Sequence, residues 1–161
     1  MTRKFLIIFF LGFSLGKIAD GAPMPLPQIT DTLLEHEKGS GKGPWLIQFW
    51  ASWCRSCSEV FYDASKLRSK FNIRYITVSL DENPNHASSY IGRHPLKDTL
   101  IGSSFSDAAG TFSNKWKVES VPTLLVIGSN GKELARLEGH YSDAEFNHFK
   151  VRLPRKKRGA P

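Results

Sequence analysis

Apolar residues along the chain fall into short runs separated by glycine, proline and polar residues, and several runs have the length and composition of β-strands. The clearest are WLIQFW at 45–50, IRYITVSL at 73–80 and TLLVIG at 123–128. They are rich in β-branched and aromatic residues, as buried strands are. The sequence SNGK at 129–132 predicts a hairpin turn, because Asn-Gly readily adopts positive φ. A returning strand is therefore expected at 133–139.

Helices are predicted between and after these strands. Apolar residues recur at helical spacing behind the segment ASWCRSC, which predicts a helix from about Cys54 to Phe71. Ser142 and Glu145 have the spacing of a capping box and predict the start of a last helix. Residues 94–105 show no clear pattern, although a short strand fits within them. The other predicted helices cover 30–38, 81–92 and 106–116, and the last covers about 142–152.

The order of these elements indicates one α/β domain. Strand, helix, strand, helices, strand, hairpin strand and helix follow each other, which predicts a mixed central sheet flanked by helices. A length of 161 residues fits a single domain, and a hydrophobic fraction of 40% is enough for a core. We place this domain at residues 22–154, with a proline-rich, extended lead-in at 22–28.

The N-terminus has the organisation of a signal peptide at residues 1–21. Two basic residues precede an apolar run at 5–15, and Ala19 and Gly21 supply the small side chains of a cleavage site. A retained membrane anchor and a buried N-terminal strand or helix are the alternatives. We expect the protein to be exported, to the bacterial periplasm or the outer face of the membrane, where disulfides persist.

The net charge of +7 is concentrated at the two ends of the chain. Residues 22–151 hold 14 basic and 14 acidic side chains, so the predicted domain is neutral. This balance gives no reason to expect nucleic-acid binding. The basic tail at 155–161 is expected to be a solvated, disordered end, with a weak contact to anionic lipid as the alternative.

Cys54 and Cys57 are the only cysteines, and they lie between a predicted strand and a predicted helix. A helix N-terminus stabilises a thiolate, so the pKa of Cys54 is expected to lie below the roughly 8.5 of a free cysteine. Arg55 adds to this effect if its side chain folds back. Helical spacing places Cys57 one turn later, which predicts a reversible disulfide. We expect the more exposed Cys54 to attack a client disulfide and Cys57 to resolve the mixed disulfide.

Other uses of two cysteines fit less well. A structural disulfide would close a very small loop, which stabilises least. A zinc site lacks a second CxxC motif, and haem attachment needs a histidine where Ser58 stands. The five histidines show no ligand spacing and are expected at surface or loop positions. We expect no metal and no cofactor, although a copper site built from both thiols and one histidine stays open.

The segment FWASWCRSC, followed downstream by VPTLLVIGSNGKEL, resembles the thioredoxin superfamily. Within it, the chain is most similar to exported thiol–disulfide oxidoreductases of the TlpA/ResA/DsbE type, over about residues 30–152. The resemblance implies a thioredoxin-like fold with an insert in the middle of the domain. It also implies that Pro122 is cis and faces the cysteines, and that Val121 offers its backbone to a substrate strand. Trp53 completes the expected substrate-binding residues.

The sequence departs from the family pattern at four places near the cysteines. Gln48 stands where thioredoxins have a buried aspartate, and Val60 where TlpA-type proteins often have an acid. Ser56 and Tyr62 occupy positions at which the family often has proline. These changes leave the disulfide chemistry intact, but the redox potential and the physiological partner do not follow from the resemblance.

The function expected from the sequence is reduction of disulfides in partner proteins by an exported monomer. The resemblance implies a membrane electron donor that recharges the protein, and cytochrome c maturation or metal-centre assembly as client processes. A disulfide-donating oxidase is the alternative within the same chemistry. A non-enzymatic copper chaperone that uses the same thiols is the alternative from another class.

Overall fold

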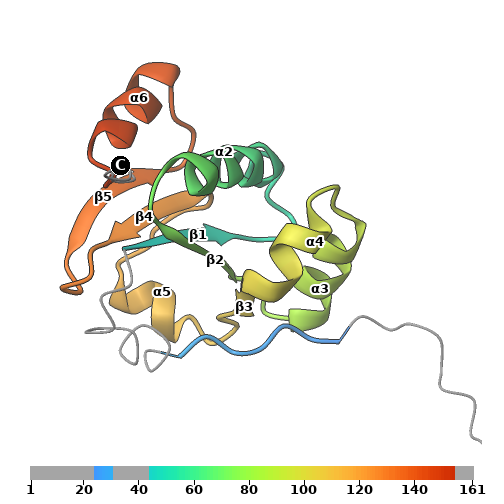
Figure 1. Cartoon of the computed structure of the whole chain (residues 1–161). Coiled ribbons are helices and arrows are strands. Elements are labelled where there is room, and N and C mark those ends of the chain that lie inside the picture. The colour runs from blue at the N-terminus through green and yellow to red at the C-terminus, as the bar shows by residue number, and fades with distance from the viewer. Residues whose placement is uncertain (1–23, 31–43, 155–161) are drawn as a thin grey trace, which may run out of the picture.

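A mixed five-stranded sheet forms the centre of the protein (Figure 1). The computed structural model describes residues 24–30 and 44–154. The expected signal peptide at 1–21, the basic tail at 155–161 and all but the first residue of the helix expected at 30–38 lie outside these ranges. Across the sheet, the strands are β3 (Ser104–Ser106), β2 (Arg74–Ser79), β1 (Trp45–Trp50), β4 (Thr123–Ile127) and β5 (Glu133–Glu138).

The strands β1, β2 and β3 run parallel, whereas β4 is antiparallel to β1 and to β5. The sheet is therefore mixed, as the sequence predicts, and the four predicted strands agree with the observed ones to within one residue at each end. The Asn-Gly turn between β4 and β5 is also present. There Gly131 has a φ of 76°, and the N–H of Gly128 donates to the carbonyl of Lys132 at 2.8 Å.

Helices lie on both faces of this sheet. In Figure 1, α2 and α6 lie above the sheet and α5 lies below it. The predicted capping box of Ser142 and Glu145 is present at the start of α6. The bounds are α2 (Cys57–Lys70), α3 (Pro84–Arg93), α4 (Lys97–Leu100), α5 (Thr111–Lys115) and α6 (Asp143–Val151), with a 3-10 turn η1 (Ile101–Ser103) after α4.

Helix α2 begins later than predicted. The expected start at about Cys54 is wrong, because the helix begins at Cys57. The chain between β1 and α2 forms turns instead, and one of them is closed by the N–H of Cys54, which donates to the carbonyl of Ala51 at 3.1 Å. The first cysteine therefore lies in a turn, and only the second is helical.

Helix α5 is also shorter than the helix predicted at 106–116. Gly110 precedes it with a φ of 68°, a left-handed conformation that interrupts a helix. The side chain of Asp107 accepts hydrogen bonds from the N–H groups of Phe112 and Ser113, at 3.1 and 2.7 Å. Asp107 thus satisfies backbone donors at the start of α5, and the residues before Gly110 remain outside the helix.

Strand β1 separates two hydrophobic cores, since its side chains alternate between the faces of the sheet. Leu46 and Trp50 pack in a cluster that includes side chains of α2, α3 and α6. Ile47 and Phe49 pack on the other face with Phe112 of α5, and the Phe49 and Phe112 rings lie 5.9 Å apart. The end of β1 is thus fixed from both sides, and the cysteine segment follows directly.

The stretch between β2 and β4, where the insert is expected, folds as α3, α4, η1, β3 and α5. The short strand β3 accounts for part of the segment that showed no clear pattern. The extended lead-in runs along its outer edge. The N–H of Ile29 donates to the carbonyl of Ser106, and the N–H of Ser106 donates to the carbonyl of Pro27, both at 2.8 Å.

Candidate redox site

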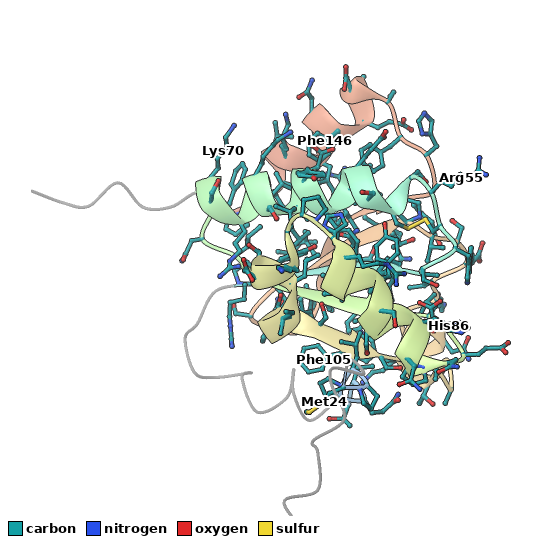
Figure 2. The ribbon with its side chains drawn as sticks, turned by 90° about the vertical axis from the view of Figure 1, so that its right-hand side faces the viewer. Met24, Arg55, Lys70, His86, Phe105 and Phe146 are labelled. Atoms are coloured by element: carbon teal, nitrogen blue, oxygen red, sulfur yellow. A yellow bond between two sulfur atoms is a disulfide. The ribbon has the colours of Figure 1, made fainter. Side chains whose placement is uncertain are left out.

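Cys54 and Cys57 form a disulfide, visible as the yellow bond in Figure 2. Their sulfur atoms are 2.05 Å apart and their Cα atoms 5.5 Å apart. Cys54 is the more accessible of the two, with 7% of its surface exposed against 0% for Cys57. The expectation of an exposed Cys54 is therefore correct only relative to Cys57, because both cysteines are buried in this state.

The N-terminus of α2 lies beside the disulfide. Ser56 is the N-cap residue, and its side chain makes no capping hydrogen bond. Its Oγ lies 3.9 Å from the sulfur of Cys54. The partial positive charge of the helix end therefore lies at Cys57, the first residue of α2. Cys54 is close to it because the disulfide joins it to Cys57. Arg55 does not fold back, since it is exposed and projects away from the body of the protein (Figure 2).

Gln48 lies beneath the second cysteine. It is fully buried, and its Nε2 donates to the carbonyl of Cys57 at 3.3 Å. The hydroxyl of Tyr75 donates to Gln48 Oε1 at 2.7 Å. Burial raises the pKa of Tyr75 well above its ordinary value, so this hydroxyl stays protonated and remains a donor. A neutral amide thus occupies the position at which the family pattern has a carboxylate, and it cannot take a proton from Cys57.

The structure brings Pro122 close to the cysteine segment. The Val121–Pro122 peptide bond is cis, as the resemblance implies. Pro122 and Ser56 line the same small cavity, of about 160 Å³. Trp53 is 70% exposed, and Val121 is half-buried against both hydrophobic cores. The position of these residues is compatible with their expected part in binding a substrate strand, which stays a prediction.

Glu138 on β5 supports the loop that leads to Pro122, and no pattern in the sequence singles it out. Its Oε1 accepts hydrogen bonds from the N–H groups of Glu119 and Ser120, at 2.6 and 2.9 Å. Its Oε2 pairs with the guanidinium of Arg136 at 3.3 Å. Burial opposes ionisation of Glu138, but these hydrogen bonds and the nearby positive charge outweigh it and lower its pKa. An ionised carboxylate therefore holds this loop.

His94 and Asp81 are two further residues that the sequence analysis missed. His94 lies in the loop between α3 and α4, one of the two expected positions for a histidine, but its side chain is buried there and not at the surface. The N–H of Leu96 donates to its Nδ1 at 3.1 Å, which leaves the proton on Nε2, and Nε2 lies 3.1 Å from the hydroxyl of Ser58. Asp81 is buried two residues beyond the end of β2 and contacts Ser52, just before the cysteines. An acid directly after a β-branched strand was the only signal for Asp81.

In residues 24–30 and 44–154, no group of three or more His, Cys, Asp and Glu side chains is arranged to hold a metal ion. Over the same part of the chain, none of the helices combines the length and hydropathy needed to cross a bilayer.

Comparison with known proteins links this site to a family. A family model described as thioredoxin-like matches residues 43–133. The thioredoxin of Synechocystis is 30% identical over 66 residues, which cover 40% of this chain and 62% of that protein. The chain thus spans less than two thirds of the length of this curated relative.

Solved structures extend the similarity to most of the chain. A structure described as a thiol:disulfide interchange protein DsbE, from Chlorobium tepidum, has 22% identity and a TM-score of 0.63, covering 81% of this chain and 91% of that one. A secreted disulfide oxidoreductase of Mycobacterium tuberculosis has 13% identity and a TM-score of 0.57, covering 81% and 96%. At these identities the likeness concerns the fold.

Proposed function

Because the chain belongs to the thioredoxin-like family, we propose that it is a thiol–disulfide oxidoreductase whose working groups are Cys54 and Cys57. The observation that carries this proposal is the Cys54–Cys57 disulfide at the junction of β1 and α2, where Ser56 and Pro122 line one cavity. The greater accessibility of Cys54 supports its role as the nucleophile. The complete burial of Cys57 supports a role in the second, internal step.

The proposed reaction transfers two electrons from the reduced protein to a client disulfide. The thiolate of Cys54 attacks one client sulfur, and the other client sulfur leaves as a thiolate and takes a proton from water. The thiolate of Cys57 then attacks the sulfur of Cys54 in the mixed disulfide. The second client sulfur leaves, and the protein is left with the Cys54–Cys57 disulfide. A donor of two electrons, proposed to be a membrane protein, must reduce this disulfide before the next cycle.

The reducing direction is supported by the resemblance to TlpA/ResA/DsbE-type proteins. In the second step Cys57 must lose its proton before it attacks. Gln48, which contacts Cys57, is an amide and cannot accept this proton as a buried carboxylate would, so the rate of this step depends on another acceptor. Candidate client processes are cytochrome c maturation and the assembly of metal centres, as the same resemblance suggests.

We also propose that the protein acts outside the cytoplasm, in the periplasm or on the outer face of the membrane. The signal-peptide pattern at residues 1–21 supports this location. The structural likeness to a secreted disulfide oxidoreductase of Mycobacterium tuberculosis adds to it.

A redox titration against glutathione, combined with an insulin reduction assay, tests the activity and its direction. A reductase is expected to reduce insulin with dithiothreitol as electron source and to have a potential near the roughly −270 mV of thioredoxin. The Cys54→Ser variant is the control and is expected to lose turnover. A potential near the roughly −120 mV of strong oxidants such as DsbA would assign the disulfide-donating direction instead. Absence of insulin reduction by the unmodified protein would contradict the proposed activity.

A further inference from the structure

A buried carboxylate ties the turn that carries Cys54 to the central sheet. Asp81 lies two residues beyond the end of β2 and is only 3% exposed. A buried carboxylate is costly unless hydrogen bonds or opposite charges compensate it. None of the ion pairs found within the described ranges involves Asp81. Hydrogen bonds therefore compensate for the burial of the Asp81 carboxylate. Their donors identify the residues that this carboxylate keeps in place.

Most of the hydrogen bonds that the Asp81 carboxylate accepts come from Ser52. The N–H of Ser52 lies 3.0 Å from Oδ2 and 3.2 Å from Oδ1, and the hydroxyl of Ser52 donates to Oδ1 at 2.7 Å. The hydroxyl of Ser79 donates to Oδ2 at 2.7 Å. Hydrogen bonds to a charged acceptor are roughly twice as strong as those between neutral groups. The position of Ser52 is therefore fixed more firmly than that of an ordinary turn residue.

Parallel pairing of β1 with β2 explains why these residues meet. Trp50 lies opposite Ser79 in the register, and the N–H of Leu80 donates to the carbonyl of Trp50 at 2.8 Å. The two strands therefore end side by side. Strand β1 continues through Ser52 to the cysteines, and strand β2 continues through Asp81 to α3. The contact between Ser52 and Asp81 therefore spans 29 positions of sequence.

Ser52 lies inside the turn that presents the first cysteine. The N–H of Cys54 donates to the carbonyl of Ala51, which closes a turn over Ser52 and Trp53. Trp53 is 70% exposed and gives this turn little packing. Cys57, by contrast, is held by α2 and by Gln48. Cys57 is thus anchored by a helix, whereas Cys54 depends on a turn whose attachment to Asp81 runs through Ser52.

We propose that Asp81 is a positioning residue that holds the Ala51–Cys54 turn in the geometry that joins Cys54 to Cys57. It acts through Ser52 and touches neither sulfur in any contact described above. By restricting the turn, Asp81 raises the effective concentration of one thiol at the other and favours closure of the disulfide. This inference rests on the proposed function for its importance to clients, but the closure of the two thiols is measurable without any client.

The test compares Asp81→Asn with Ser79→Ala in glutathione equilibria. Asparagine keeps the size of the side chain but cannot accept a hydrogen bond at its NH₂ group. The closure equilibrium constant of Asp81→Asn is expected to fall about tenfold, which corresponds to about 30 mV. Ser79→Ala removes the hydroxyl that donates to Asp81 Oδ2 and accepts from the Asp81 N–H, but it removes none of the Ser52 donors, so a change within about twofold is expected. Equal changes in the two variants would overturn the proposal.

The pH profile separates positioning from a simple effect of charge. A positioning effect changes the closure constant by the same factor from about pH 5 to 9, whereas loss of a charge acts only where a thiolate forms. A change confined to pH values at which the Cys54 thiolate forms would overturn the proposal. If Asp81→Asn fails to fold, Ser52→Ala replaces it, because it removes the 2.7 Å hydroxyl contact from within the turn. Ser52→Ala must then lower the closure constant more than Ser79→Ala does, and an equal or smaller effect would reject the proposal.

Insulin reduction by the unmodified protein is measured separately. Its absence would contradict the proposed activity and leave the glutathione result for Asp81 unaffected. Its presence, together with equal closure constants in Asp81→Asn and Ser79→Ala, would support the activity and reject the positioning role.

Discussion

The side-chain amide of Gln48 donates a hydrogen bond to the backbone carbonyl of Cys57 at 3.3 Å, and no charge lies in this contact. On its other side, Gln48 accepts a hydrogen bond from the hydroxyl of Tyr75 at 2.7 Å. The fully buried amide therefore links the first residue of α2 to strand β2. Because an amide does not titrate near neutral pH, residue 48 is expected to add no step of its own to the pH dependence of disulfide exchange.

The contact between Gln48 and Tyr75 is expected to stabilise the protein cooperatively. Tyr75→Phe leaves Gln48 Oε1 without its donor, and Gln48→Leu leaves the Tyr75 hydroxyl and the Cys57 carbonyl without this partner. Each single variant is expected to lower the free energy of unfolding by about 1–3 kcal/mol. The double variant should lose less than the sum, because it removes both members of one contact. Urea unfolding of the oxidised proteins measures these changes.

Tyr62→Phe provides the control for this cycle, since Tyr62 is 40% exposed. Its effect on the free energy of unfolding is expected to stay within about 0.5 kcal/mol. Strict additivity of Tyr75→Phe and Gln48→Leu would show that the buried pair is not energetically coupled.

The two cysteine variants are expected to differ in trapping clients. In Cys57→Ser no second thiol remains to attack the mixed disulfide on Cys54, so clients should accumulate as heavier bands that a reductant releases. Cys54→Ser should trap few or none, because Cys57 is fully buried in the disulfide-bonded protein. Non-reducing gels of both variants make the comparison, and equal trapping would refute the assigned roles.

Stability is expected to decrease in mild acid because of His94. Burial lowers the pKa of this histidine from its ordinary value of about 6.5. Between the two pKa values the unfolded chain binds more protons than the folded protein does. The contribution of neutral His94 to the free energy of unfolding is therefore complete above about pH 6.5. It is lost as the pH falls towards the pKa that His94 has in the folded protein. Urea unfolding between about pH 5 and 7.5 measures this decline.

The comparison of two histidine variants assigns this decline to its source. His94→Gln is expected to flatten the dependence of the free energy of unfolding on pH in this range. His86→Gln changes an exposed histidine on α3 and should retain the dependence (Figure 2). If both variants kept the full decline, another group would be responsible.

Export is expected to remove residues 1–21. The basic start, the apolar run at 5–15 and the small residues Ala19 and Gly21 motivate this prediction. Intact-mass analysis of protein from the exported fraction gives the answer directly. A mass that still includes Met1 to Gly21 would favour a retained membrane anchor.

The sequence predicts those features of the fold that depend on local patterns. Strands β1, β2, β4 and β5 follow from runs of apolar and β-branched residues, and the start of α6 follows from the spacing of Ser142 and Glu145. The start of α2 was predicted too early, because it depends on how the chain leaves β1. The turn closed between Ala51 and Cys54 removes three residues from the expected helix, and periodicity alone does not detect it.

The supporting contacts of the site could not be predicted, because they join distant parts of the sequence. Gln48 and Tyr75 are 27 positions apart, and they meet only because β1 and β2 pair in parallel. The contact between Asp81 and Ser52 has the same origin. The cysteines were identifiable because their spacing is itself the signal, whereas an isolated glutamine or aspartate reveals its role only once its partners are in place.

The pairing of the lead-in with β3 also limits how far the N-terminus of the protein can be trimmed. An uncovered edge strand offers free N–H and C=O groups to another chain and promotes aggregation. Here Pro27 and Ile29 occupy both hydrogen-bonding groups of Ser106. A cut after Gly21 leaves this cover in place, whereas proteolysis beyond Ile29 would remove it. A cut beyond Ile29 is therefore expected to lower the solubility of the protein, although Cys54 and Cys57 remain in it.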